Sequence, residues 1–331
     1  MTTEKIKTAC IYGAGAIGGW IGAGLAGAGC SVSVVARGAT LEALDRHGLR
    51  VVSGTDTRSA AVQASADPAA LGVQDLVVIA VKAPALIDVA RHIAPLIGPD
   101  TLVLTAMNGV PWWFFQGFGG RYAGTQLKAV DATGEIAAAI PAANVIGCVV
   151  HASCSVDAPA VIRHHFGNGL IIGEPSGQQS ARVLALAELL VRAGFATSVS
   201  AQIQKDTWYK LWGNMTVNPI SAFTGATTDL ILGDELVRDF ISKIMLEAKE
   251  IGARIGLPIE QQPEDRHAVT LKLGAFKTSM LQDVEAGKAV ELDALVSVVR
   301  ELGQLTQVPT PFTDALLGLS RLHARVHRLY P

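Results

Sequence analysis

The fold is decided near the start of the chain, by the stretch Thr8-Ala9-Cys10-Ile11-Tyr12-Gly13-Ala14-Gly15-Ala16-Ile17-Gly18. An apolar strand pattern runs directly into a glycine-rich turn. A helix of small residues follows to about Ala28, and a second strand is expected at Ser31–Ala36. This order of elements, within about 30 residues, is typical of a dinucleotide-binding βαβ unit. The sequence therefore predicts a Rossmann domain.

Each glycine of this turn has a physical reason to be there. Gly13 permits the tight turn, Gly15 lets the backbone approach a pyrophosphate, and Gly18 lets the helix pack closely on the strand. The start of the helix presents free N–H groups and the positive end of its dipole to the phosphates. We therefore expect the whole turn to contact the cofactor, that is Gly13, Ala14, Gly15, Ala16, Ile17 and Gly18.

The end of the second strand bears on which dinucleotide is bound. Enzymes that use NAD place an Asp or Glu there to accept hydrogen bonds from the ribose hydroxyls. This strand ends Val34-Val35-Ala36-Arg37-Gly38, without a carboxylate. The Arg37 guanidinium can hold a 2′-phosphate through charge-assisted bonds, although an ordinary exposed loop arginine is the alternative interpretation. The sequence favours NADPH over NADH.

Composition excludes several classes of protein. The 331 residues carry a formal net charge of −2, with 50% hydrophobic and 17% charged residues, which argues against a nucleic-acid partner. The uncharged stretch 8–36 is rich in glycine, and no signal-peptide cleavage pattern follows it, so we expect a cytoplasmic protein without membrane contact. The four cysteines lack CxxC spacing and His164-His165 lies in an alternating strand pattern, so we expect neither disulfide nor metal site.

The remaining pattern divides the chain near residue 200. Strands are expected over 75–81, 101–105, 145–152, 161–165, 170–172 and 197–199, with an amphipathic helix over 180–193. From about Ala201 onward the periodicity is helical. We expect an α/β protein in which residues 1–200 form a Rossmann-type doubly wound sheet and residues 201–331 form an all-α substrate and catalytic domain.

Polar side chains follow two of the expected strands. Lys82 comes directly after one, and Asn108 after the next. Ligands of such sheets lie beyond the carboxyl ends of the strands, so both residues are candidates to line the nicotinamide end of the cofactor. For Asn108-Gly109 a simple turn is the alternative.

The helical half carries a more informative pattern. Lys210, Asn214 and Asn218 are four residues apart, and each step of four turns a helix by about 40°, so the three side chains share one stripe. The residues between them are largely apolar, and buried polar groups without partners are costly. The stripe is therefore expected to face a cleft that receives a polar substrate. Ser279 and Glu291 offer a hydroxyl and an acid from neighbouring segments.

Taken together, these motifs resemble the ketopantoate reductases, over nearly the whole chain. The resemblance rests on the glycine turn, Arg37, Val81-Lys82, Asn108-Gly109, Lys210-Leu211-x-x-Asn214-x-x-x-Asn218-Pro219, Ser279-Met280-Leu281-Gln282-Asp283 and Glu291-Leu292-Asp293. It implies NADPH-dependent reduction of a 2-oxo acid, first of all 2-dehydropantoate. Lys210 would be the catalytic lysine, with Glu291 beside it. Asn214, Asn218 and Ser279 would contact substrate, and Asn108 and Lys82 would lie where cofactor and substrate meet.

Two departures from the family pattern leave the substrate open. The aromatic run Trp112-Trp113-Phe114-Phe115 is either buried packing or a reshaped cleft mouth. The segment Ala226-Thr227-Thr228-Asp229 has threonine where these enzymes usually carry a substrate-binding asparagine. Another branched or hydroxylated 2-oxo acid is the alternative substrate, and an NADPH-sensing protein without turnover is the alternative class. The helical half is compatible with a homodimer.

Overall fold

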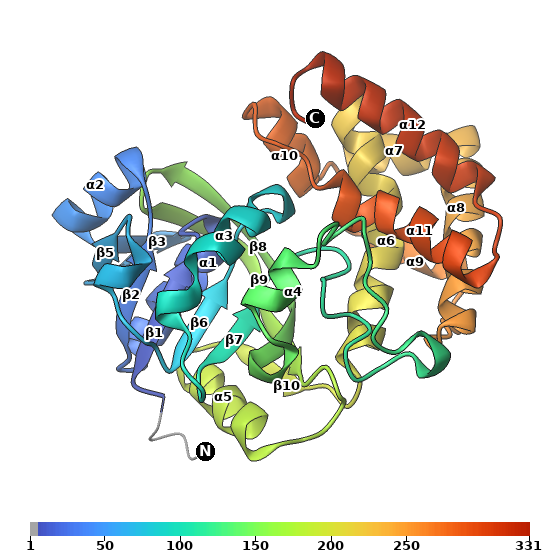
Figure 1. Ribbon diagram of the computed structural model, residues 1–331. Coiled ribbons are helices and arrows are strands. Elements are labelled where there is room, and N and C mark those ends of the chain that lie inside the picture. Colours follow the sequence, from blue (N-terminus) through green and yellow to red (C-terminus); the bar gives the residue numbers. More distant parts are fainter. Residues whose placement is uncertain (1–5) are drawn as a thin grey trace.

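The computed structural model describes residues 6–331, as a sheet-containing part and a helical part set side by side (Figure 1). The strands are β1 (Thr8–Tyr12), β2 (Ser31–Val35), β3 (Leu49–Ser53), β4 (Asp56–Ala60), β5 (Gln63–Ser65), β6 (Leu76–Ile79), β7 (Leu102–Thr105), β8 (Val145–Ala158), β9 (Val161–Gly173) and β10 (Ala196–Val199). The first part also holds helices α1 (Ala16–Gly27), α2 (Gly38–His47), α3 (Leu86–His92), α4 (Glu135–Ala139) and α5 (Ala181–Arg192).

All ten strands form one sheet in the order β4-β3-β9-β8-β7-β6-β1-β2-β5, with β10 paired to β9. The central strands are parallel, while β3–β4 and the long β8–β9 hairpin are antiparallel. One core joins α1 and α5 to one face of the sheet, and a second core joins α3 and α4 to the other face. Helices on both faces of a mostly parallel centre confirm the predicted α/β class.

The hairpin and three small strands depart from the sequence prediction. The strands expected over 161–165 and 170–172 are one strand, β9, interrupted at Gly167, whose φ is +75°. β8 and β9 are paired with register shifts, which are typical of β-bulges. The strands β3, β4 and β5 were not predicted, and β4 is polar and mostly exposed, so it shows no alternating pattern.

The glycine turn has the packing that its sequence demands. Gly13 has φ +101°, a left-handed conformation that favours glycine. A Cβ on Gly18 would lie 2.1 Å from the Gly13 carbonyl oxygen, whereas a Cβ on Gly15 would meet nothing within 4 Å. The turn is therefore closed on the side of the sheet and open above Gly15, at the start of α1.

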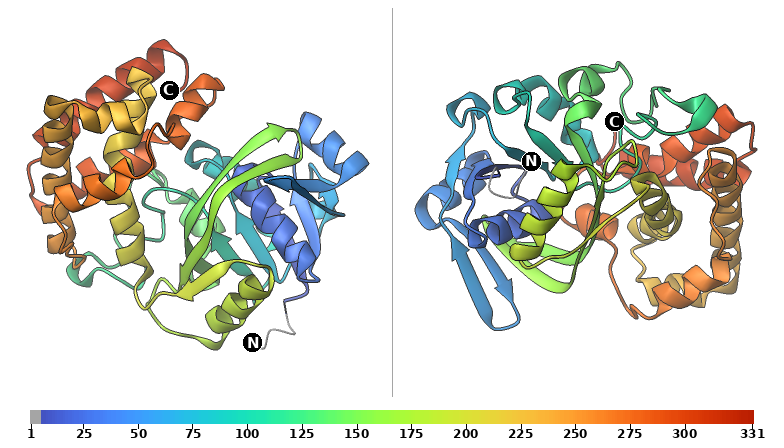
Figure 2. Two further views of the ribbon diagram at one scale, coloured as in Figure 1. Left: turned by 180° about the vertical axis from the view of Figure 1, so that it is seen from behind. Right: turned by 90° about the horizontal axis from the view of Figure 1, so that it is seen from below.

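The second part contains only helices among the residues described after β10. They are α6 (Ile203–Thr224), α7 (Thr228–Gly233), α8 (Glu235–Arg254), α9 (Pro263–Leu271), α10 (Ser279–Glu285), α11 (Val298–Thr306) and α12 (Pro311–Val326). A π-helical segment, Asp293–Ser297, leads into α11. Figure 2 shows these helices gathered on one side of the sheet, with α6 running beside the β8–β9 hairpin.

The loop after β7 contributes aromatic side chains to both the helical core and the sheet core. Phe114 and Phe115 are fully buried and pack in the same hydrophobic cluster as Trp208 and Trp212 of α6. The preceding Trp112 and Trp113 pack on the sheet instead. The aromatic run thus joins the two parts.

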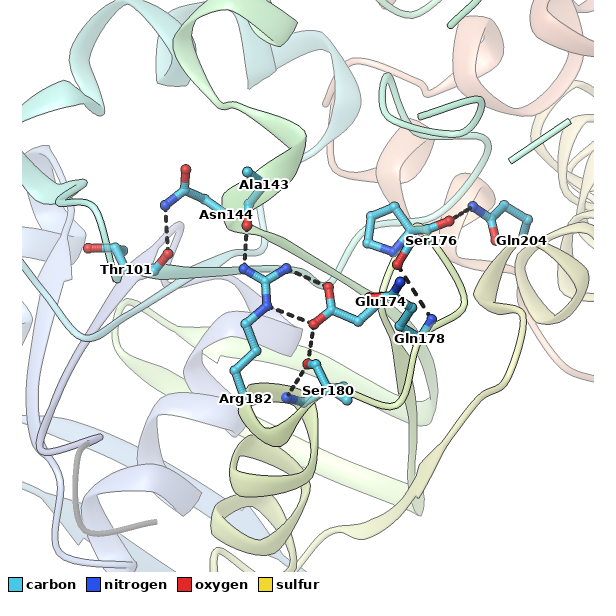
Figure 3. A network of polar contacts seen from close by, with 11 residues as sticks. Thr101, Ala143, Asn144, Glu174, Ser176, Gln178, Ser180, Arg182 and Gln204 are labelled. Carbon is cyan, nitrogen blue, oxygen red and sulfur yellow. Dashed lines mark hydrogen bonds and ion pairs between the residues drawn. The ribbon is translucent and has the colours of Figure 1, made fainter. Parts of the chain in front are cut away.

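A buried ion pair fixes the connection between β9 and α5 (Figure 3). Glu174 is only 4% exposed and accepts hydrogen bonds from Arg182 and from the Ser180 hydroxyl, with Arg182 Nε at 2.7 Å. Arg182 also donates to the Ala143 carbonyl. Gln204 at the start of α6 donates to the Pro175 carbonyl over 2.7 Å, so this network also fixes where α6 begins.

Within residues 6–331, no helix combines the length and the apolar character that crossing a membrane requires.

Candidate active site

A cavity of about 640 Å³ lies between the carboxyl edge of the sheet and the helical part. Its walls come from the turn after β6, the loop after β7, the middle of α6, the segment 289–294 and the residues at and after the end of α12. Pockets of 300–1,000 Å³ with mostly apolar walls and a few polar groups are typical ligand sites. The polar groups of this cavity include Lys210, Asn108, Asn214 and Glu291.

Lys210 links the two parts at this cavity. Its Nζ donates to Asn108 Oδ1 over 2.9 Å and to the Val150 carbonyl of β8 over 2.7 Å. Burial lowers the pKa of Lys210 to about 8, a shift that Cys148 and Glu291 oppose and the positive charge of Arg266 reinforces. A lysine with such a pKa exchanges a proton near neutral pH, as general acid catalysis requires.

The rest of the predicted stripe is only partly at the cavity. Asn214 lines it one turn after Lys210. Asn218 is 8% exposed and lies beyond the cavity wall, farther along α6. Ser279 begins α10, is exposed, and also lies outside the lining. Lys210, Asn108, Asn214 and Glu291 are therefore brought together, whereas Asn218 and Ser279 stand apart from them.

Lys82 and Glu291 meet across the two parts. Lys82 Nζ lies 3.3 Å from Glu291 Oε2 and 2.7 Å from Asp283 Oδ2, and the Ala83 backbone N–H donates to Glu291 Oε1 over 2.9 Å. Burial disfavours the charge of Lys82, but Glu291 and Asp283 outweigh that effect and raise its pKa. Both oxygens of Glu291 are thus engaged by the sheet part. The sequence pattern does not assign a role to Asp283, because its partner Lys82 lies 201 residues away along the chain.

The residues expected to bind the cofactor lie at the carboxyl ends of β1 and β2. Gly15 leaves open space at the first turn of α1, which fits a pyrophosphate held by backbone N–H groups. Arg37 lies at the end of β2, where its Nη2 is 3.1 Å from Asp88 Oδ2 of α3. Its side chain is 61% exposed and therefore accessible to a phosphate. The residues present fit a bound dinucleotide.

Other cavity residues could not be read from the sequence pattern. Trp112 and Trp113 are buried, as the packing interpretation of the aromatic run expects, and they also line the cavity. Arg325 and Arg328 line the cavity from the end of α12 and the residues after it. Thr228 is buried and donates to the Gly274 carbonyl over 2.6 Å, which makes it a structural residue here.

Within residues 6–331, no group of three or more His, Cys, Asp or Glu side chains has the arrangement of a metal site.

A Rossmann sheet whose edge faces a lysine-bearing helix defines a class of two-part, nicotinamide-dependent oxidoreductases. Residues 9–177 match the family model described as ketopantoate reductase PanE/ApbA, and residues 202–324 match the model of its C-terminal part. The chain belongs to the ketopantoate reductase family.

Relatives and solved structures agree with this assignment. The chain is 48% identical to a 2-dehydropantoate 2-reductase of Mesorhizobium japonicum, over 94% of this chain and 96% of that one. It is 27% identical to a 2-dehydropantoate 2-reductase of Halobacterium salinarum, over 95% and 98% of the two chains. A crystal structure from Ralstonia solanacearum MolK2, with a provisional ketopantoate reductase assignment, has a TM-score of 0.95 and 56% identity, covering 98% of this chain and 100% of that one.

Proposed function

We propose that this protein reduces 2-dehydropantoate to pantoate with NADPH. The observation that carries the proposal is Lys210, buried between the edge of the sheet and the helical part with a pKa near 8. The curated relatives named 2-dehydropantoate 2-reductase support the substrate.

Reduction of a ketone builds negative charge on the carbonyl oxygen, and NADPH supplies the hydride. Lys210 can stabilise that charge as an ammonium and then donate its proton to the oxygen. Asn108 accepts a hydrogen bond from Lys210 Nζ and so orients the ammonium. Burial keeps this proton transferable, because it lowers the pKa of Lys210 from its usual value of 10.5.

Several further roles belong to the same proposal. The glycine turn would hold the pyrophosphate and Arg37 the 2′-phosphate, which favours NADPH. Glu291 would act beside Lys210, on a substrate hydroxyl, once Lys82 or Ala83 releases one of its oxygens. Asn214 would contact substrate directly, and Asn218 and Ser279 would do so only if the parts move closer together.

The test replaces Lys210 with Ala and follows NADPH consumption with 2-dehydropantoate. We expect kcat to fall by about 10²–10⁴-fold, since that is the usual contribution of general acid catalysis. Binding of NADPH, measured by titration, should be unchanged. The matched control is Lys205→Ala, an exposed lysine on the same helix. A Lys210→Ala variant with near-normal kcat would remove the catalytic role.

The pH profile of the unaltered protein gives a second measurement on the same residue. Only protonated Lys210 can donate, so kcat/KM should fall as the pH rises through about 8. A profile that stays flat to the usual pKa of lysine would contradict the lowered pKa.

A second candidate is a related enzyme for a bulkier 2-oxo acid. It is favoured by the apolar cavity wall of Trp112, Trp113 and Val110. A D-mandelate dehydrogenase solved with NADH and anilino(oxo)acetate shares the fold at a TM-score of 0.82 and 19% identity. Comparing kcat/KM for 2-dehydropantoate with kcat/KM for aromatic 2-oxo acids separates the two candidates. A protein that binds NADPH but reduces neither would be a sensor.

A further inference from the structure

Arg266 of α9 lies against the backbone of α6. Its Nε and Nη2 are 2.6 Å and 2.9 Å from the position that a Cβ on Gly213 would occupy. Only glycine leaves room for a guanidinium this close to a helix. The guanidinium carbon also lies 5.4 Å from the centre of the Tyr209 ring, one turn earlier on α6. The Arg266 side chain thus packs against Gly213 and Tyr209 of α6.

The charge of Arg266 has no partner of opposite sign. Its Nε is buried and makes no hydrogen bond. Within residues 6–331, no carboxylate oxygen lies within the 4.0 Å of the guanidinium that an ion pair requires. An unsatisfied buried donor on a charged group is costly, so a position of this kind suits an anionic ligand.

This unpaired cation contacts α6 one turn from Lys210, at Gly213, and neither Arg266 nor Gly213 is part of the cavity wall described above. Gly213 is three residues after Lys210, so the two positions are neighbours on one face of α6. The charge of Arg266 acts to lower the pKa of Lys210, and desolvation, Lys210 and Arg266 together lower the pKa of His151. Asp206, the acid that acts on His151, accepts a hydrogen bond from the Ser200 hydroxyl. An anion bound here would relieve the repulsion between these positive groups.

We propose that Arg266 binds the carboxylate of the 2-oxo acid while Lys210 faces the adjacent carbonyl oxygen. This inference rests on the proposed function, because a 2-oxo acid carries those two groups on neighbouring carbons. A planar guanidinium matches a carboxylate with two parallel hydrogen bonds. Arg266 is then a substrate-binding residue that the sequence pattern did not reveal, and Gly213 is the residue that positions it.

A phosphate of NADPH is the other anion that a guanidinium could hold. Arg266 comes from the helical part, whereas the glycine turn and Arg37 belong to the sheet part, so the carboxylate is the better match. Separate measurements of the affinity for the 2-oxo acid and the affinity for NADPH show which of these two anions Arg266 binds.

Two variants test the proposal. Arg266→Gln removes the charge, and Gly213→Ala places a methyl group where the guanidinium lies while improving helix propensity. Each should raise KM for 2-dehydropantoate by about ten- to a hundredfold, the usual effect of losing a hydrogen bond to a charged group. The KM for the methyl ester of the same acid should change little. The matched control is Lys272→Gln, which removes an exposed charge at the end of α9.

The pH profile supplies a readout that a structural role would not move. The charges of Cys148, Glu291 and Arg266 all affect the pKa of Lys210, and the Arg266→Gln variant removes only the charge of Arg266. Since Arg266 lowers the pKa of Lys210, its loss should move the alkaline limb of kcat/KM to higher pH in Arg266→Gln.

The outcomes are distinct. Equal losses on acid and ester, or a loss confined to NADPH affinity, would overturn the proposal, as would unchanged kinetics.

Calorimetric binding of pantoate to the unaltered protein and to Arg266→Gln tests it without turnover. Weaker pantoate binding by the variant supports Arg266, and equal binding overturns it. An unaltered protein that binds pantoate but reduces no 2-oxo acid would count against the proposed function alone.

Discussion

Arg37, which follows β2, forms an ion pair with Asp88 of α3, and both side chains are exposed. An exposed ion pair stabilises a protein by only about 0–1 kcal/mol, so a 2′-phosphate can displace Asp88 at little cost. We therefore expect Arg37→Ala to weaken NADPH binding by about ten- to a hundredfold, the loss of one charge-assisted bond, and to leave NADH binding nearly unchanged. Titration with both cofactors measures this.

Asp88→Asn is the companion variant. It frees Arg37 from its partner, so NADPH should bind as tightly as before or more tightly. If Arg37→Ala weakens both cofactors equally, the preference for the 2′-phosphate has no basis in this residue.

Single residues also show how far the sequence alone could go. The spacing of Lys210 and Asn214 predicted a shared helix face, and the structure places both at the cavity. The sequence did not predict roles for Asp283 and Arg266, because the residues that they contact, Lys82 and Gly213, lie on other elements. Helical periodicity predicts which residues of one helix are neighbours, at spacings of three and four. It does not predict contacts between different elements, which depend on how the elements pack.

At the scale of elements, α1 depends on the close fit of its first turn. A Cβ at Gly18 would lie 2.1 Å from the Gly13 oxygen and 3.0 Å from Ala80 Cβ. We expect Gly18→Ala to lower stability by about 1–3 kcal/mol, the usual effect of overpacking, and to abolish tight NADPH binding because the turn must shift. Thermal unfolding and cofactor titration measure the two effects.

The same helix provides the control. Gly27, its last residue, has nothing within 4 Å of an added Cβ, so Gly27→Ala should be neutral or stabilising by about 0.5–1 kcal/mol. If the two variants lost stability alike, helix propensity rather than close packing would explain both.

The elements differ in how well the sequence revealed them. The βαβ unit was predictable because its strands are buried on both faces and its glycines mark the turn. Strand β4 is exposed and polar, so it lacks the periodicity of a regular strand, and Gly167 at positive φ divides the pattern of β9 into the two shorter strands that the sequence predicts. Their positions depend on pairing with β3 and β8, which only the folded sheet defines.

For the whole molecule, the division at residue 200 remains a prediction about domains, and the structure shows how closely the two sides are joined. Phe114 and Phe115 come from the first part but pack among the helices of the second. The ion pairs of Lys82 cross the same boundary at the cavity. The aromatic run and the ion pairs of Lys82 therefore both connect the two parts, and any movement of one part against the other must be accommodated at these contacts.

Asp283 is the residue through which that coupling can be tested. Asp283→Asn leaves Lys82 with Glu291 alone, and we expect a loss of about 1–2 kcal/mol, smaller than for a fully buried pair because Lys82 is 40% exposed. Glu291 would then be held more tightly by Lys82 and less available to substrate. The KM for 2-dehydropantoate should rise more than kcat falls.

The control is Asp314→Asn, which breaks an exposed pair with Arg300 and should change stability by less than about 0.5 kcal/mol. A double-mutant cycle with Lys82→Met decides whether the effect passes through Lys82. If it does, Asp283→Asn should cost much less in a Lys82→Met background than in the unaltered protein. Equal costs in both backgrounds would mean that Asp283 stabilises α10 by itself, and that the two parts are held together by apolar packing at the aromatic run.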